Sequence, residues 1–131
     1  MFQEQVRALI ERQCRLLHDQ ANRLGWILAD ADPDDPASPA LDVSAARRAC
    51  ARVLHRAETL GLDTVHERAT TLDASLAALE RHQEVRSWHM CDLMGQHAAL
   101  ANAVDEVEAE DTTLYSDCAS ASAVAPPPAF I

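Results

Sequence analysis

The sequence contains no lysine, only three glycines and few aromatic residues (4 %). Alanine and leucine dominate its apolar part, and β-branched residues are scarce. Because strands favour β-branched and aromatic side chains whereas alanine and leucine favour helices, this composition argues against a sheet. We expect an all-α fold, and 131 residues are enough to bury one core.

The chain also lacks long apolar runs and a surplus of basic residues. No apolar run approaches the ~20 residues that span a bilayer, and charges interrupt the first twenty residues, where a signal peptide has its apolar segment. Acidic residues outnumber basic ones by 21 to 11, which gives a formal charge of -10. Nucleic-acid phosphates require a broad basic face. We therefore expect a cytoplasmic protein that binds neither membrane nor nucleic acid.

Signatures of nucleotide binding and of nucleophilic catalysis are missing. The chain contains no G-x-G-x-x-G, P-loop, G-x-S-x-G or Cys–His nucleophile pattern. The four cysteines are far apart and form no C-x-x-C pair, so we expect reduced thiols rather than disulfides.

A group of possible metal ligands lies late in the chain. His82, His89, Cys91 and His97 follow one another at steps of 7, 2 and 6 residues. Two ligands on one helix must lie three or four residues apart, so this spacing does not favour a metal site. We predict no metal and no cofactor, and we expect His97 to be a buried, hydrogen-bonded core residue.

Four segments carry apolar residues at helical spacing. We expect helices over about residues 3–30, 43–60, from 63 to a weak point near 80–83, and 84–109. The third segment has a regular leucine stripe that includes Leu72 and Leu76, which we expect to be buried.

The links between these segments are polar and contain helix-terminating residues. Prolines and acids after the first segment predict a solvated loop. Asp42 or Ser44 is expected to cap the second helix, Gly61 to end it in a left-handed conformation, and Asp63 or Thr64 to cap the third.

These elements predict an antiparallel up-down-up-down four-helix bundle over residues 1–110. Residues 111–131 are rich in serine, alanine and proline and show no periodicity. We therefore predict a disordered, flexible C-terminal tail that is dispensable for stability.

The expected second helix is unusually basic. It carries Arg47, Arg48, Arg52 and Arg56 against one acid, Glu58, and so has a local charge of +3 in a chain of charge -10. A basic stripe in so acidic a protein indicates a working surface. The alternative is that these arginines pair with acids on neighbouring helices, where exposed pairs contribute little.

The stretch from residue 51 to 79 resembles the histidine-phosphotransfer (HPt) family, which carries a phosphoacceptor histidine on the second helix of a four-helix bundle. The family pattern is H-x-[LI]-K-G-x-[AS]-x-x-[LF]-G-[LA]. Its matching positions here are Val53, Ala57, Leu60, Gly61 and Leu62, and residues 62–79 look like the family's third helix. The resemblance implies a signalling protein of a two-component phosphorelay whose partner is a response-regulator receiver domain.

The chain departs from the family at the phosphoacceptor. Ten residues before Gly61, where the family has its histidine, this sequence has Ala51. His55 lies four residues further on and so shares the helix face of Ala51. The guanidiniums of Arg52 and Arg56 would disfavour an imidazolium and could hold phosphoryl oxygens. His55 is the candidate phosphoacceptor, and the alternative is a surface histidine without chemistry.

A second histidine pattern lies on the expected third helix. His66-Glu67-x-x-Thr70 is similar to the H-E-x-x-[TN] motif of dimeric histidine-kinase phosphoacceptor helices. No ATP-binding domain follows it, and three fixed letters recur by chance, so we favour a chance match.

Two functional hypotheses follow. The first is an HPt-like protein that docks a receiver domain or another acidic protein surface, as a pseudo-phosphotransfer adaptor or through the shifted histidine. It would be a phosphocarrier or binding protein rather than a turnover enzyme. Its partner-binding residues would be Arg48, Ala51, Arg52, His55 and Arg56. The second is a non-catalytic helical interaction or assembly module unrelated to phosphotransfer. The exposure of His55 discriminates between them.

Overall fold

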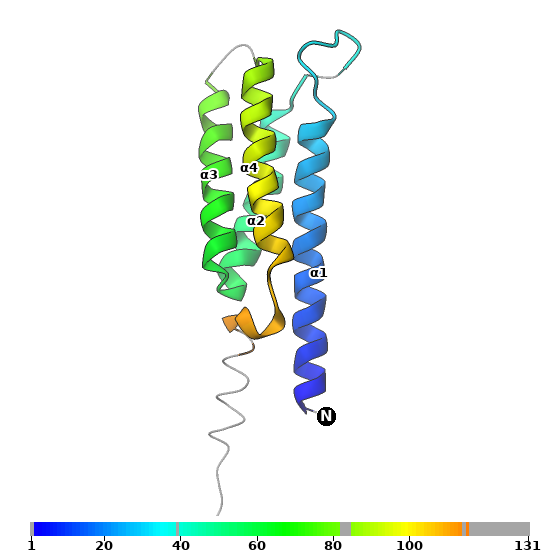
Figure 1. The fold of residues 1–131 in the computed structure, drawn as a ribbon, viewed down its shortest axis with the longest axis vertical. Helices are drawn as coiled ribbons and strands as arrows, with labels where there is room; N and C mark the ends of the chain where they lie inside the picture. Colours follow the sequence, from blue (N-terminus) through cyan, green and yellow to red (C-terminus); the bar gives the residue numbers. More distant parts are fainter. Residues whose placement is uncertain (1, 39, 82–84, 114, 116–131) are drawn as a thin grey trace, which may run out of the picture.

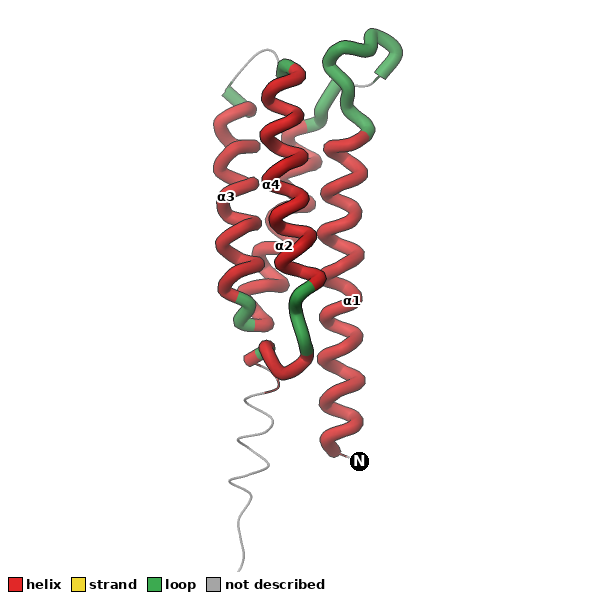
Figure 2. Tube along the Cα trace, in the orientation of Figure 1, coloured by secondary structure: helices red, strands yellow, loops and turns green. Residues whose placement is uncertain are grey.

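The computed structural model describes residues 2–38, 40–81, 85–113 and 115 (Figures 1 and 2). These described residues form four long helices and one short 3-10 helix. These are α1 (Phe2–Ala29), α2 (Val43–Leu60), α3 (Asp63–Leu79), α4 (Ser87–Asp105) and η1 (Ala109–Asp111).

The four helices form an antiparallel up-down-up-down bundle, as the sequence predicts (Figure 1). Each helix packs against its two neighbours in the order α1, α2, α3, α4 and back to α1, and no contacts join the diagonal pairs α1–α3 and α2–α4 in the described part of the chain. One core runs along the bundle axis, and Leu72 and Leu76 are fully buried in it, as predicted. Among the described residues, no helix is long and apolar enough to cross a membrane.

Both ends of α2 are fixed by local chemistry. The Asp42 carboxylate accepts a hydrogen bond from the backbone N–H of Ala45 at 3.0 Å, which confirms one of the two predicted caps. Gly61 adopts φ 69° and ψ 34°, and the N–H of Leu62 donates to the carbonyl of Ala57 at 2.9 Å. This is the left-handed helix end that only glycine adopts without strain.

The predicted cap of α3 is wrong. Leu62 occupies the N-cap position and provides no side-chain hydrogen bond, and Asp63 is already the first helical residue. The reason is that the turn after Gly61 buries Leu62 in the core, which leaves no room for a further linking residue.

The loop after α1 is held by its own polar side chains. The N–H of Asp34 donates to the Asp32 carboxylate at 3.0 Å, and the N–H of Ala37 donates to Asp35 at 2.9 Å. The Ser38 hydroxyl donates to the carbonyl of Asp30 at 2.8 Å. These short-range bonds are typical of Asp and Ser turns and stabilise a solvated loop, as predicted.

The chain turns back after α4, which is shorter than predicted at both ends. Residues 107–113, here called the closing segment, run beneath the lower ends of α2 and α3 (Figure 2). Thr112 is only 1 % exposed, although the sequence places it in the tail. Its hydroxyl donates to the carbonyl of Ala109 at 2.8 Å and accepts from the N–H of Tyr115 at 3.2 Å. Residues 114 and 116–131 lie outside the described part, so the expected tail stays a prediction there.

Candidate functional site

The outer face of α2 carries the residues that the sequence selected. The opposite face of this helix is buried and consists of Ala46, Ala49, Cys50, Val53, Ala57 and Leu60. Arg48, Ala51, Arg52 and His55 are all exposed. Because Arg48, Arg52 and His55 follow at steps of four and three, they lie along one outward line.

His55 points to solvent rather than into the bundle. It lies five residues before the end of α2, and its backbone carbonyl accepts a hydrogen bond from the Thr59 hydroxyl at 2.9 Å. Within the described part of the chain, the side chains of His55 and Arg52 make no hydrogen bond and no ion pair. The imidazole and the neighbouring guanidinium are therefore both open to a partner.

Arg56, which the sequence predicts as a partner-binding residue, is not exposed in the row that Arg48 and Arg52 form. It is half-buried, and its guanidinium donates to the side-chain oxygens of Gln13 and Gln20 on α1. The exposed row therefore contains Arg48 and Arg52, while Arg56 links α2 to α1 through hydrogen bonds. Arg56 is held by two neutral amides, so its positive charge is not cancelled there.

Arg47 lies on the side of α2 that faces α3, opposite to Arg56, and forms ion pairs within the bundle. It donates to Asp73 at 3.1 Å and to Glu80 at 3.0 Å, both on the α3 side. The hydrogen bonds to Asp73 and Glu80 raise the pKa of the Arg47 guanidinium above its usual value. Of the two interpretations of the basic stripe, a working surface or pairing with acids on neighbouring helices, the second therefore holds for Arg47.

A shallow groove of about 390 Å³ lies between α1 and α2, next to the exposed row. Arg23 and Arg52 face it from the two helices, and Asp19 is the acid in its lining. The full lining is Leu16, Asp19, Gln20, Arg23, Ala49 and Arg52. The groove extends the basic surface of α2 toward α1.

His66 lies on α3 beside this surface. Two contacts fix the register of α2 against α3: Arg47 with Asp73, and the Cys50 thiol with the carbonyl of Ala69 at 3.2 Å. In antiparallel helices this register puts His66 at about the height of His55. His66 is half-buried, and the Thr70 hydroxyl donates to its carbonyl at 2.7 Å. Thr70 is therefore engaged within its own helix.

The thiol of Cys50 is structural. It is fully buried, and burial, followed by the Asp73 carboxylate, raises its pKa to about 12. Because the thiolate is the reactive form, this cysteine is a poor nucleophile at neutral pH.

The histidines of α4 have structural contacts. The Nε2 atom of His97 lies 2.8 Å from the carbonyl of Ala21, so the predicted hydrogen bond is present, although the side chain is half-buried rather than fully buried. The Nδ1 atom of His89 accepts a hydrogen bond from the backbone N–H of Arg86 at 2.9 Å. The centroids of the His89 and Trp88 rings lie 3.7 Å apart. His82 lies outside the described residues. Among those described, no three His, Cys, Asp or Glu side chains come together as a metal site.

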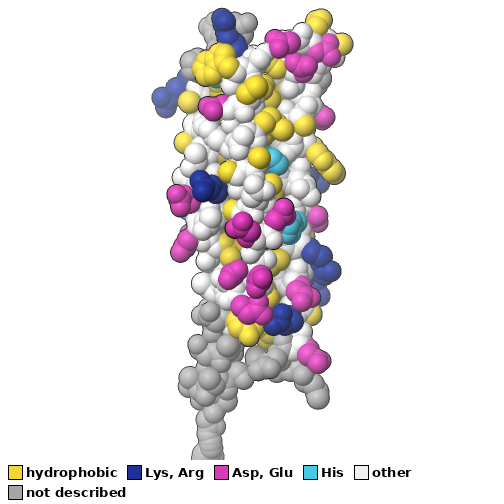
Figure 3. All heavy atoms as spheres, viewed as in Figure 1, with side chains coloured by type: hydrophobic (Ala, Val, Ile, Leu, Met, Phe, Trp, Pro, Cys, Tyr) yellow, Lys and Arg dark blue, Asp and Glu magenta, His cyan; other side chains and the backbone are white. Residues whose placement is uncertain are grey.

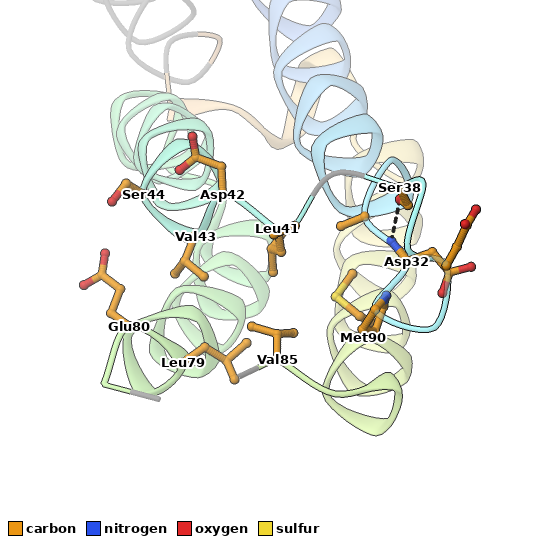
Figure 4. A pocket seen from close by; sticks show the side chains of 14 residues that line it. Asp32, Ser38, Leu41, Asp42, Val43, Ser44, Leu79, Glu80, Val85 and Met90 are labelled. Atoms are coloured by element: carbon orange, nitrogen blue, oxygen red, sulfur yellow. Dashed lines mark hydrogen bonds between the residues drawn. The ribbon is translucent and has the colours of Figure 1, made fainter. Parts of the chain in front are cut away.

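A cavity of about 580 Å³ at the upper end of the bundle had no signal in the sequence (Figure 4). It lies between the loop after α1, the start of α2, the end of α3 and the start of α4. Two of its carboxylates are already engaged, because Asp42 caps α2 and Glu80 pairs with Arg47. No periodic pattern predicts this cavity, since it forms between loop ends rather than along one helix.

No model of a known protein family, no curated protein and no solved structure matches this chain.

Proposed function

We propose that this protein is an HPt-like signalling protein of a cytoplasmic two-component phosphorelay, which docks a response-regulator receiver domain on the outer face of α2. One observation carries the proposal: His55 is exposed on α2, five residues before the end of this helix, in an antiparallel four-helix bundle and beside an arginine with no partner among the described residues.

The chemistry fits the position of this histidine. An imidazole nitrogen would attack the phosphorus of an aspartyl phosphate, the P–O bond to the carboxylate would break, and the carboxylate would leave with the bonding electrons. The phosphoryl oxygens carry the charge during transfer, and a nearby guanidinium stabilises them. Arg52 lies one helical turn before His55 and is exposed.

The surface around the histidine fits close approach of a folded partner. Ala51 stands one turn before His55, and its small side chain leaves the backbone of α2 accessible. Arg48 and Arg52 would meet the carboxylates that surround a receiver's phosphorylated aspartate. Such rim charges mainly accelerate encounter and select the partner.

Phosphoryl uptake is tested with a phosphorylated receiver domain or a small phosphodonor, followed by intact mass. If the relay is active, the protein gains one phosphoryl group, His55→Ala abolishes the gain and His66→Ala retains it. Uptake that survives His55→Ala but not His66→Ala would move the site to α3. If neither the wild type nor any variant takes up a phosphoryl group, the protein can act only as an adaptor. Measurement of receiver-domain binding then tests this form of the proposal.

Docking is tested by titrating the protein with a receiver domain at two ionic strengths. Arg52→Glu should weaken binding, and added salt should weaken it further, because a Debye length of about 8–10 Å screens these charges. Arg68→Glu on α3 is the matched control, since Arg68 is also exposed. Equal binding by both variants would show that α2 is not the interface.

The second candidate is a helical assembly module without phosphotransfer. It is favoured by a different observation, the exposed side chains of Trp88 and Met94 on α4. Because α2 and α4 lie diagonally across the bundle, the two candidates make predictions for separate surfaces.

A further inference from the structure

Most of the basic residues of this protein lie on two neighbouring helices. Eight of the eleven arginines belong to α1 and α2, together with only four of the twenty-one acids. Figure 3 looks onto the side of the bundle away from α2, and acidic side chains gather over the lower half of that side. The two sides of the bundle therefore differ in charge, and an anion is attracted to the side that α1 and α2 form.

The groove between α1 and α2 lies on this basic side. Arg23 faces it from α1, and Arg52 faces it from α2. Neither guanidinium forms a hydrogen bond or an ion pair with another described residue. Each guanidinium is a planar fork of donors that matches the oxygens of a phosphate or a carboxylate. Two unpaired forks therefore face one groove from two different helices.

The groove keeps a positive charge although its lining contains an acid. Asp19 lies four residues before Arg23 and within its reach, yet no ion pair joins them in the described part of the chain. One carboxylate can neutralise only one of the two lining arginines. Arg48 and Arg56 lie one turn to either side of Arg52, and Arg56 is bonded to neutral amides alone. Both add to the positive potential at the groove.

The other acids of α1 and α2 lie on other sides of these helices. Glu58 follows Arg47 by three turns, and so it lies on the side of α2 that faces α3. Glu11 precedes His18 by two turns, and the Nδ1 atom of His18 lies 3.4 Å from a carboxylate oxygen of Asp105 on α4. Glu11 therefore lies on the side of α1 toward α4. The remaining acid of α1 is in its first turn, below the groove.

Acids of the loop after α1 lie above the groove. Asp30 follows Arg23 by seven residues and Asp42 precedes Ala49 by seven, which is about 10 Å along each helix. Asp42 is also engaged as the cap of α2. Because the Debye length is about 8–10 Å, solvent ions largely screen the repulsion between these acids and an anion in the groove. The two lining guanidiniums would contact that anion directly.

The rest of the lining suits the uncharged part of a ligand. Ala49 has a small side chain, which opens the groove where α2 faces α1, and Leu16 remains 38 % exposed. The Oε1 atom of Gln20 accepts from Arg56, which leaves the amide N–H groups of Gln20 as donors. The groove thus combines hydrogen-bond donors with a small apolar surface.

We propose that this groove binds a small phosphate monoester, with the phosphoryl group between Arg23 and Arg52 and the apolar group against Leu16. A phosphoryl group presents three peripheral oxygens, which can accept from two guanidinium forks at once, whereas the two oxygens of a carboxylate satisfy one fork. Its charge of nearly two at neutral pH matches the surplus of arginines over acids around the groove. The volume of about 390 Å³ accommodates a ligand of this size.

This site goes beyond the proposed docking of a receiver domain and is tested without one. Arg23 and Leu16 lie on α1, outside the row that would meet the receiver, whereas Arg52 belongs to both surfaces. An occupied groove would withhold the Arg52 guanidinium from a receiver domain, and the ligand would then compete with docking through this one residue.

Phenyl phosphate is the probe, titrated into the full-length chain at constant ionic strength and followed by NMR of backbone amides and arginine side chains. The shifts should saturate. Arg23→Gln and Arg52→Gln should each raise the dissociation constant at least about fivefold, because each removes a charged donor. Arg12→Gln is the matched control, since Arg12 is exposed on α1 outside the lining. It should change the constant less than about twofold, through screened attraction alone.

Two further variants separate binding in the groove from a loss of folding. Asp19→Asn should lower the dissociation constant about twofold or more, because it removes a carboxylate that repels the phosphoryl group. A damaged fold would not bind more tightly. Leu16→Ala should weaken the binding of phenyl phosphate and leave that of inorganic phosphate unchanged, since inorganic phosphate has no apolar group.

Three results would overturn the proposal. Shifts that do not saturate, or equal effects of Arg12→Gln and the two groove variants, would mean that the basic side attracts anions without a site. A dissociation constant that Asp19→Asn does not lower would place the phosphoryl group elsewhere. Circular dichroism of each variant verifies that the helices are intact.

Discussion

The ring of His97 lies against Gly25 so closely that a Cβ atom at residue 25 would come within 2.6 Å of the ring's Cε1 atom. The same ring is held by the 2.8 Å contact between its Nε2 atom and the carbonyl of Ala21. The glycine therefore gives α1 and α4 their close approach, and the histidine uses the space that it leaves.

We predict that Gly25→Ala lowers the free energy of unfolding by about 1–2 kcal/mol, because overpacking outweighs the better helix propensity of alanine. The ring can move aside only by losing its bond to Ala21. In a His97→Ala background the change in the free energy of unfolding should reverse its sign, because the clash is gone and only the better helix propensity of alanine remains. Gly25→Ala should then stabilise the fold by about 0.5–1 kcal/mol. Urea denaturation of the four chains of this cycle measures the coupling. Additive effects would contradict the contact.

Leu76 tests the core of the bundle. It is fully buried on α3, so Leu76→Ala should cost about 2–5 kcal/mol through lost burial and the cavity left behind. Leu16→Ala, at a leucine on α1 that remains 38 % exposed, is the matched control and should cost much less. Equal losses in chemical denaturation would place the core elsewhere.

The sequence predicted some helix ends better than others because only some carry their own chemistry. The bounds of α2 were predicted correctly, since Asp42 and Gly61 both mark an end. At the start of α4 the N-cap is Arg86, a residue type that gives no such signal, and its ends were misplaced. The burial of Thr112 was missed because one polar residue in the closing segment has no periodicity.

Helical periodicity predicted which residues of the candidate site are exposed, but it did not predict their contacts with other helices. Exposure of Arg48, Arg52 and His55 follows from their spacing against the buried stripe. The direction of Arg56 does not, because Gln13 on a different helix determines it. Contacts between residues far apart in the chain are not encoded in any local pattern.

The contact between Gly61 and the closing segment is a further test. A Cβ atom at Gly61 would lie 2.2 Å from the Thr113 methyl group, and the residue has a φ of +69°. Gly61→Ala should therefore destabilise by more than the ~1–2 kcal/mol of a left-handed alanine. In a Thr113→Ala background the cost should fall toward that figure. An identical cost in both backgrounds, measured in urea, would show that the contact is not formed.

Truncation separates the closing segment from the residues after it. Removing residues 116–131 should leave the thermal midpoint unchanged, because they contain few core-type residues and three consecutive prolines. Removing residues 108–131 should lower it by several degrees, since Thr112 and the Arg7–Glu110 ion pair are then lost. Calorimetry of both chains decides this. A fall of several degrees in the first chain would mean that the C-terminal residues pack on the bundle.

The ion pair between Arg7 and Glu110 makes the closing segment sensitive to acid. The hydrogen bond from Arg7 lowers the pKa of the Glu110 carboxyl below its usual value of about 4.3. Since the folded-state pKa lies below that of the unfolded chain, the pair stabilises the fold above about pH 4.3, and this contribution is lost as pH falls through the folded pKa. Carboxyl-detected NMR should show the pKa of Glu110 rising toward 4.3 in Arg7→Gln. Arg15→Gln, at an exposed arginine of α1, should leave it unchanged. A Glu110 pKa that is the same in Arg7→Gln and the wild type would mean that the closing segment is not held to α1 by this pair.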